Sequence, residues 1–272
     1  MKYELNYISS PIDVDGIAER RLKIKKKPVV PLGDIEKKYG PILVKYLKPF
    51  VITQLIAKGA MGDVFIACDR NDCLKVVKIQ KLDHMKFFSN ELKMQKHFYK
   101  LGLAPKIIKA FTFLNNKTEY SVVVMEKVDL TLGDLLKRNL DKEILDQIIT
   151  MVYGIIDVLT KEKLIHGDLH WMNIGLVWDK HENHIMLKPL LLDFGWSWND
   201  ETNVLPELEI TQLLRTLNRK YFPVNKQNEK VIESGLYKLL STFQPKFPRN
   251  YDDYNSYYEQ LLAHYIRNIR RG

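Results

Sequence analysis

Apolar and polar residues alternate over several short stretches in the first half of the chain, and this period of two is typical of β-strands. Strands are expected over residues 50–57, 63–68, 73–80, 106–114 and 120–128. Residues 87–101 instead have helical spacing, and this stretch ends at Gly102 with Pro105 beyond it, as helices commonly do. The first half of the chain therefore predicts a small sheet accompanied by one helix.

The second half of the chain has mainly helical spacing. Residues 142–163 carry an apolar residue every three or four positions, and Asp141 precedes them as a candidate N-cap. A hairpin over residues 174–178 and 185–192 follows. Helices are then expected over residues 206–221, 227–243 and 254–270. A strand-rich half followed by a helix-rich half predicts an α+β protein with two lobes, and a ligand is expected in the cleft between such lobes.

Basic residues are concentrated near the N-terminus. The chain carries a formal net charge of +9, and residues 1–50 hold eleven Lys and Arg against six Asp and Glu. The densest basic run, residues 20–27, predicts contact with an acidic partner or with nucleic acid. A plain solvated segment is the alternative, since no aromatic residues are interleaved to stack on bases. Residues 1–48 are therefore assigned to a basic N-terminal extension, which is irregular except for a short helix over residues 33–47.

The composition of the chain bears on its expected location in the cell and on the state of its cysteines. The sequence contains no run of 18 apolar residues, so no membrane span is expected, and the first residues lack the apolar core of a signal peptide. An intracellular, cytoplasmic location is the expectation. Cys68 and Cys73 have a spacing that fits neither a zinc site nor a disulfide framework, which favours two reduced thiols flanking a turn.

A glycine turn joins the first two predicted strands. Gly59 and Gly62 let backbone N–H groups approach phosphates without an intervening side chain. The turn lies between two strands and not between a strand and a helix, which favours the phosphate-covering flap of a kinase over a P-loop or a dinucleotide fold. Taken alone, the pattern also fits an ordinary glycine hairpin.

The third predicted strand carries the candidate phosphate-binding lysine. Lys78 faces opposite to its two apolar neighbours by strand alternation, which predicts a half-buried position from which its ammonium group reaches phosphates. Lys75 and Lys81 are its rivals. The lysine needs an anionic partner, and Glu91 on the following helix is the candidate, with an exposed helical glutamate as the alternative interpretation.

The most specific signal is the loop IHGDLHWMN at residues 165–173, which follows the long helix, together with LLDFG at residues 191–195. Phosphoryl transfer needs a group that accepts the proton of the incoming hydroxyl. It also needs oxygen ligands that hold Mg²⁺ against the β- and γ-phosphates. Asp168 is the candidate base, and Asn173 and Asp193 are the candidate metal ligands.

This order of motifs resembles the protein-kinase-like superfamily over roughly residues 50–222. The resemblance is to its compact atypical members, the RIO kinases and the small kinase subunit of the KEOPS complex, and also to kinases of large DNA viruses. It implies a bilobal fold with a β-rich N-lobe over residues 49–128 and a helical C-lobe over residues 129–272. It also implies ATP and Mg²⁺ as cofactors, with Mn²⁺ as an alternative ion, and a viral origin would extend the location to host cell or virion.

The resemblance also implies a set of site residues. The residues that would contact the nucleotide are Gly59, Ala60, Gly62, Val64, Lys78, Glu126 and Val128. Among these, Glu126 and Val128 belong to a stretch similar to the kinase hinge, whose backbone would hydrogen-bond adenine. Lys78 and Glu91 would form the pair of strand lysine and helix glutamate, and Asp168 would be the catalytic base.

Two departures from the family pattern concern regulation. Gly167 stands where many protein kinases have an arginine that pairs with a phosphate on the activation loop. Only twelve residues separate Asp193 from Pro206, which is too short for a full activation segment. Phosphorylation of Ser197 or Thr202 is therefore not expected to be required for activity.

Other departures concern residues around the nucleotide and the catalytic loop. Ala57 replaces the first glycine of the turn, so phosphate closure there would differ. His170 stands where many Ser/Thr kinases have a lysine for the γ-phosphate, and it either donates a hydrogen bond there or is structural. Glu207 or Glu209 would replace the acidic residue that usually braces the catalytic loop.

These observations favour an atypical Ser/Thr protein kinase that transfers the γ-phosphate of ATP to a protein substrate. A small-molecule kinase of the aminoglycoside or choline kinase type is the runner-up, because it shares the HGD loop and needs no peptide-docking platform. The LLDFG motif and Glu91 favour the protein kinase. A pseudokinase scaffold is disfavoured because each expected metal ligand and the expected base are present.

Overall fold

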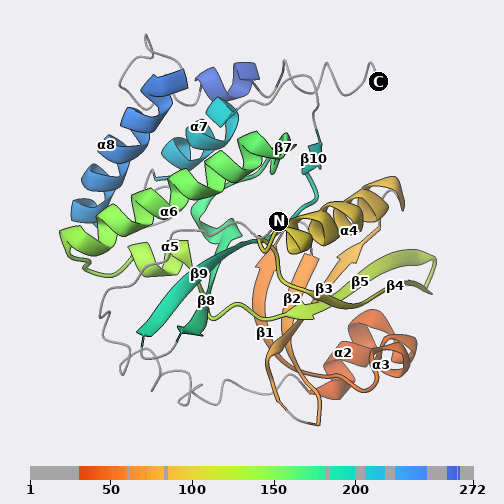
Figure 1. Cartoon of the computed structure of the whole chain (residues 1–272). Coiled ribbons are helices and arrows are strands. Elements are labelled where there is room, and N and C mark those ends of the chain that lie inside the picture. The colour runs from red at the N-terminus through yellow and green to blue at the C-terminus, as the bar shows by residue number, and fades with distance from the viewer. Residues whose placement is uncertain are drawn as a thin grey trace. The chain divides into compact units, whose positions relative to one another are not determined.

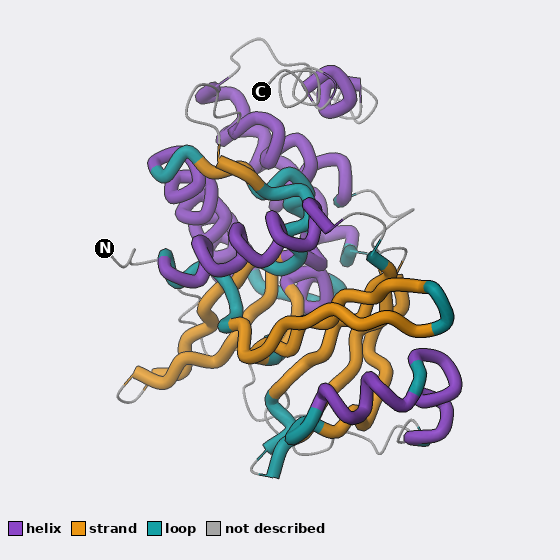
Figure 2. Tube along the Cα trace, turned by 90° about the vertical axis from the view of Figure 1, so that its right-hand side faces the viewer, coloured by secondary structure: helices purple, strands orange, loops and turns teal. Residues whose placement is uncertain are grey.

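The computed structural model describes residues 31–59, 62–70, 72–82, 85–181, 184–199, 206–217, 224–243, 256–261 and 263. These residues form an α+β structure that divides into two compact units (Figures 1 and 2). The sheet unit comprises the described residues of 31–89 and 105–127. The helical unit comprises residues 90–104 and the described residues from Val128 onward. The predicted α+β class is confirmed.

The sheet unit contains a five-stranded antiparallel sheet in the order β1-β2-β3-β5-β4. Its strands are β1 (Val51–Gly59), β2 (Gly62–Cys68), β3 (Lys75–Lys81), β4 (Ile107–Asn115) and β5 (Thr118–Glu126). Phe65, Val77 and Val124 pair across the three central strands and are almost fully buried. Because paired residues on neighbouring strands share a face of the sheet, they mark the core-facing side.

Two helices cover this core-facing side (Figure 2). Helices α2 (Leu32–Tyr39) and α3 (Pro41–Leu47) bury Ile35, Leu43 and Leu47 against the sheet. The prediction of one short helix at the end of an irregular extension is therefore wrong. The chain reverses at Gly40, which has φ 83°, and Pro41 begins the next helix at a position where its missing N–H costs nothing. The basic run at residues 20–27 lies outside the described residues.

The helical unit contains three long helices that pack together: α6 (Lys142–Lys161), α7 (Pro206–Thr216) and α8 (Lys226–Phe243) (Figure 1). Asp141 caps α6 as predicted, since its carboxylate accepts a hydrogen bond from Ile144 N at 2.9 Å. Helix α4 (Met85–Lys100) begins in the sheet unit and continues into this one from Asn90. In the part of the chain that the structure describes, every helix is too short or too polar to cross a membrane.

Short strands complete the helical unit. The predicted hairpin is present as β8 (Ile174–His181) and β9 (His184–Leu191), and β6 (Leu130–Thr131) adds to it just before the short helix α5 (Leu132–Leu136). β7 (Leu164–Ile165) pairs with β10 (Trp198–Asn199). Of the helix predicted over residues 254–270, residues 256–261 and 263 are described, and they are helical.

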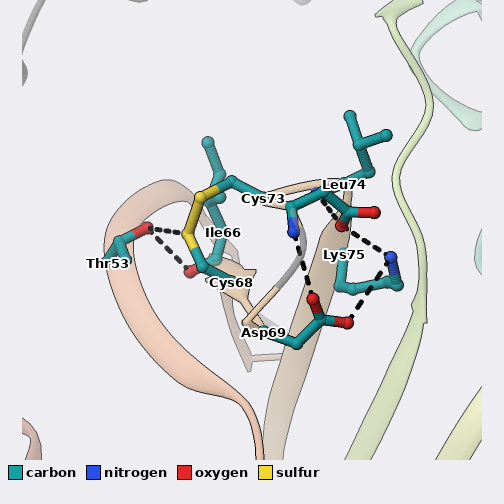
Figure 3. The surroundings of a disulfide bond; sticks show 8 residues. Thr53, Ile66, Cys68, Asp69, Cys73, Leu74 and Lys75 are labelled. Atoms are coloured by element: carbon teal, nitrogen blue, oxygen red, sulfur yellow. Dashed lines mark hydrogen bonds and ion pairs between the residues drawn. A yellow bond between two sulfur atoms is a disulfide. The ribbon is translucent and has the colours of Figure 1, made fainter.

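The two cysteines correct a prediction. Cys68 and Cys73 form a disulfide across the turn between β2 and β3, with their Cα atoms 3.9 Å apart (Figure 3). The spacing alone matched no disulfide framework, but the reversal of the chain brings the two ends of this six-residue stretch together. Lys75 and Asp72 form an ion pair beside the bond, with 2.7 Å between Nζ and Oδ1.

Candidate active site

The loop between β7 and the 3₁₀ helix η1 (Trp171–Asn173) carries the candidate base. Asp168 keeps about a third of its side chain exposed, at 34%. Its Oδ1 accepts a hydrogen bond from Gln212 Nε2 at 2.9 Å, and its Oδ2 lies 3.4 Å from Asn173 Nδ2. The carboxylate is thus oriented by two neutral amides, which leave it able to accept a further proton.

Asn173 and Asp193 lie beside Asp168 in the helical unit. Leu192 N donates to the backbone oxygen of Asn173 at 2.8 Å, which ties the end of β9 to the loop that carries the candidate base. Asn173 Nδ2 donates to the backbone oxygen of Asp168 at 2.9 Å, so its carbonyl Oδ1 is the side-chain atom that suits a cation. Asp193 follows with φ 63°, a left-handed backbone conformation. The structure therefore brings together the three residues that the sequence singled out for base and metal.

Burial changes the protonation of this loop. Burial, followed by the charge of Asp193, raises the pKa of Asp168 to about 6. Burial lowers the pKa of His170 to about 4, so its imidazole is neutral near pH 7. His170 Nδ1 accepts a hydrogen bond from Met172 N at 3.2 Å, which puts the ring proton on Nε2, 3.8 Å from Asp168 Oδ2.

The side chain of His166 holds the loop through hydrogen bonds and aromatic contacts. Its ring is fully buried and contacts Phe98 and Phe194, with centroid distances of 6.4 and 5.4 Å. Nε2 donates to Leu192 O at 2.9 Å, and Nδ1 accepts from Asp168 N at 3.4 Å. Burial lowers the pKa of His166 to about 4, and the bond that Nδ1 accepts from Asp168 N requires this neutral ring. The imidazole therefore ties Asp168 to the segment that carries Asp193.

Glu209 on α7 braces the same loop from the other side. Its Oε1 accepts hydrogen bonds from His166 N at 2.6 Å and from Gly167 N at 2.9 Å. Burial raises the pKa of Glu209 to about 7, although these two bonds favour the charged form. The sequence left Glu207 and Glu209 open as the brace, and the contacts select Glu209.

Steric constraints require a glycine at position 167. Its φ is 79°, and a Cβ atom there would lie 2.3 Å from Trp196 O. An arginine is excluded at this position by the backbone itself. Ser197 is nearby and buried, and its hydroxyl donates to His166 O at 2.8 Å, so it is not presented for phosphorylation. Thr202 lies outside the described residues.

Gln212 was missed by sequence reasoning. It lies one helical turn after Glu209 on α7, and both side chains reach the catalytic loop. The i, i+3 spacing puts the two residues on neighbouring positions of one helix face, which is the signal that could have identified it. The same helix thus holds both the backbone and the carboxylate of the loop.

In the sheet unit, β3 places Lys78 as strand alternation predicted. Lys78 pairs with Val64 on β2 and with Val123 on β5, so the three share the face opposite to α2 and α3. Lys78 is buried. Its rival Lys75 lies on the other face and forms the ion pair with Asp72. Lys81 also belongs to that other face and is exposed.

The pairing of β1 with β2 reaches the glycine turn, where Gly59 pairs with Gly62. Gly62 has φ 141°, and a Cβ atom there would lie 2.3 Å from Ile79 O, so only glycine fits. Ala60 lies outside the described residues. The two glycines leave a turn free of side chains at its base, which is the property that phosphate binding needs.

The remaining candidates are divided between the units. Glu91 is buried on α4 in the helical unit, whereas Lys78 belongs to the sheet unit, so their pairing stays a prediction. Glu126 N donates to Lys106 O at 3.1 Å, which commits that amide to the sheet unit. Val128 is the first residue of the helical unit, and its side chain packs against Gly175. The adenine contacts of this stretch also stay a prediction.

The residues present fit Mg²⁺. Asp168 and Asp193 are near enough for the charge of one to raise the pKa of the other, and a bound cation would relieve this repulsion. Mg²⁺ is usually held by one or two carboxylates together with substrate phosphates, and not by a cage made of protein alone. The described residues contain no cluster of three or more His, Cys, Asp or Glu side chains suited to a metal.

Comparison with known proteins adds no relative. The chain matches no model of a known protein family, and no curated protein matches it. The chemistry of the site therefore follows from its own residues.

Proposed function

We propose that this protein is an ATP-dependent phosphotransferase with a bilobal protein-kinase-like fold, and specifically an atypical Ser/Thr protein kinase. The observation that carries the proposal is the meeting of Asp168, Asn173 and Asp193 around one loop. A base for the acceptor hydroxyl and oxygen ligands for Mg²⁺ are parts that recur in phosphoryl-transfer enzymes. The resemblance of the motif order to compact atypical kinases supports the same conclusion.

In the proposed reaction, the acceptor hydroxyl oxygen forms a bond to the γ-phosphorus while the bond to the β–γ bridging oxygen breaks. ADP leaves, and the hydroxyl proton passes to Asp168 Oδ2, since Oδ1 is held by Gln212. Asn173 Oδ1 and the Asp193 carboxylate would hold Mg²⁺, which neutralises phosphate charge when bound. Lys78 would bind the α- and β-phosphates, oriented by Glu91, and the backbone of Gly59 and Gly62 would cover them.

The choice of protein acceptor is part of the proposal. Trp198 and Asn199 pair with β7 soon after Asp193, so the segment before α7 returns directly to the catalytic loop. This leaves little chain for a peptide-docking platform, which favours the small-molecule kinase as the second candidate. Offering protein and small-molecule hydroxyl acceptors in the same assay separates the two.

The test is transfer of labelled γ-phosphate by the purified full chain. Asp193→Ala is expected to lower the rate about a thousandfold or more, because a lost metal ligand removes several kcal/mol of transition-state stabilisation. Lys78→Met is expected to lower it by orders of magnitude, whereas Lys75→Met, a matched change on the other face of β3, should have little effect. Near-normal transfer by a folded Asp193→Ala variant would rule out this mechanism.

A further inference from the structure

A single arginine extends the face of α7 that holds the candidate base. Arg215 lies three residues after Gln212, the residue that donates to Asp168 Oδ1 at 2.9 Å. Residues three apart are neighbours on a helix surface. The ring of Tyr258, on which Arg215 stacks, packs against Ile165 at the start of the same loop. Helix α7 thus carries a cation about one turn beyond the residue that holds Asp168.

The guanidinium of Arg215 stacks on an aromatic ring. The guanidinium carbon of Arg215 lies 4.1 Å from the ring centroid of Tyr258, which comes from the C-terminal helical segment. Tyr258 is 5% exposed and packs with Ile165 and Leu208. Stacking on a buried ring pre-organises a guanidinium and reduces the entropy it loses on binding. Arg215 is therefore placed by the fold and is not a freely moving surface side chain.

The same guanidinium also forms an ion pair with the Glu259 carboxylate. Arg215 Nη1 lies 3.5 Å from Glu259 Oε1, and the two side chains are 26% and 63% exposed. Because the Glu259 carboxylate is largely exposed to water, its attraction to Arg215 is weak, and a better-fitting anion displaces it readily. The planar fork of a guanidinium matches carboxylate and phosphate groups with two parallel hydrogen bonds.

We propose that Arg215 is a specificity-determining residue that binds an anionic group, carboxylate or phosphate, next to the acceptor hydroxyl. Glu259 occupies this place when no acceptor is bound. An anionic acceptor would otherwise be repelled by Asp168 and Asp193, and Arg215 offsets that repulsion at the point of entry. The inference rests on the proposed function and adds its substrate class: hydroxyl acceptors with an acidic neighbour, such as a serine flanked by glutamates.

The experiment compares serine peptides flanked by glutamate, alanine or lysine, together with a phosphorylated and an unphosphorylated sugar. The full-length protein is expected to show a KM about tenfold lower for the acidic peptide than for the alanine peptide. Arg215→Gln should remove this preference while leaving the KM for ATP unchanged, and Arg215→Lys should restore part of it. Glu259→Gln should lower the KM for the acidic peptide, because the internal competitor is gone.

The matched control is Lys161→Gln, which removes a cation from an exposed ion pair on α6 in the same unit and should leave every constant unchanged. Transfer without a preference for anionic acceptors, or an unchanged preference in a folded Arg215→Gln variant, overturns the inference and leaves the proposed function standing. A preference for the phosphorylated sugar alone supports Arg215 and assigns the acceptor to small molecules.

A second measurement keeps the two hypotheses apart. Binding of a fluorescent Glu-flanked serine peptide is followed by polarisation without ATP, for the native protein and for Arg215→Gln. If no acceptor is phosphorylated but the peptide binds and Arg215→Gln weakens it about tenfold, the proposed function fails and the anion site stands. Equal binding by both proteins overturns the anion site whatever the transfer assay shows.

Discussion

At the scale of single residues, burial decides which groups of the candidate catalytic loop carry charge. It lowers the pKa of His166 and His170 to about 4, and it raises the pKa of Asp168 to about 6 and of Glu209 to about 7. Near neutral pH both imidazoles are therefore neutral, and the brace Glu209 is close to its own titration. The structural hydrogen bonds of the loop depend on these protonation states.

The raised pKa of Glu209 predicts how the free energy of unfolding depends on pH. Its pKa is raised in the folded protein from the ordinary 4.5 to about 7, so folding favours the protonated form. Its contribution to the free energy of unfolding is then complete below pH 4.5 and is lost as the pH rises to about 7. The change corresponds to about 3 kcal/mol. Glu209→Gln keeps an acceptor oxygen without a charge, so it should gain up to this amount relative to the native protein between pH 5 and pH 8.

Urea unfolding of both proteins at several pH values measures this difference. Taking the difference between the two proteins cancels the titration of groups that do not interact with Glu209, whereas Asp168, whose charge raises the pKa of Glu209, stays part of that difference. Glu207→Gln, on the same turn of α7 but less buried, is the control and should show a nearly constant difference across the range. A native protein that became more stable than Glu209→Gln above pH 7 would contradict the pKa shift.

At the scale of elements, α2 holds the strand that leaves the glycine turn. Asp63 directly follows Gly62, and its Oδ2 accepts hydrogen bonds from Lys38 and from Tyr39, the latter at 2.6 Å. Burial raises the pKa of Asp63, but these hydrogen bonds outweigh it and keep the pKa below its ordinary value. The ring of Tyr39 also packs edge-on against Phe65. The two N-terminal helices are thus structural parts of the sheet unit.

Removing the Tyr39 hydroxyl should lower the stability of the sheet unit. Tyr39→Phe keeps the ring and loses the hydrogen bond to a charged, buried carboxylate, so the free energy of unfolding should fall by about 2 kcal/mol. Tyr46→Phe is the matched control on α3, because its side chain is 44% exposed and its ring contact with Phe111 does not involve the hydroxyl. Equal effects of the two substitutions would show that Asp63 does not depend on Tyr39.

At the scale of the whole molecule, the candidate groups are shared between two units. Lys78 and the glycine turn belong to the sheet unit, whereas Asp168 and Asp193 belong to the helical unit. Phosphoryl transfer by the proposed mechanism needs groups from both. The activity of this protein is therefore expected to depend on the integrity of each unit, including the helices that precede the sheet.

Truncation tests where the catalytic part of the chain begins. Deleting residues 1–30 should preserve phosphate transfer to a generic acceptor, because the buried residues of α2 begin at Ile35. The same deletion should weaken binding to an acidic polymer such as polyglutamate, most clearly at low salt, where charges are less screened. Deleting residues 1–47 should abolish folding of the sheet unit, since Leu43 and Leu47 belong to its core. A shorter deletion that already unfolds the protein would show that residues 1–30 are structural.

The sequence by itself determined the features that depend on local periodicity. Helical spacing predicted α6 and its cap Asp141, and alternation placed Lys78 on the face of β3 opposite to Val77 and Ile79. The spacing of the loop residues singled out Asp168, Asn173 and Asp193, which the structure brings together. These features are readable because each depends on neighbours a few residues away, or on a motif whose chemistry requires particular residue types.

Only the tertiary structure decided the contacts between distant segments. It selected Glu209 over Glu207, added Gln212 to the site, and placed Tyr258 and Glu259 on Arg215. It also closed the Cys68–Cys73 disulfide, which spacing alone did not suggest. Residue spacing alone did not reveal these pairings, because each depends on which surfaces the packed helices and turns bring face to face. The same physical reason explains Gly167, because a side chain there would meet the Trp196 backbone and the Trp198 ring.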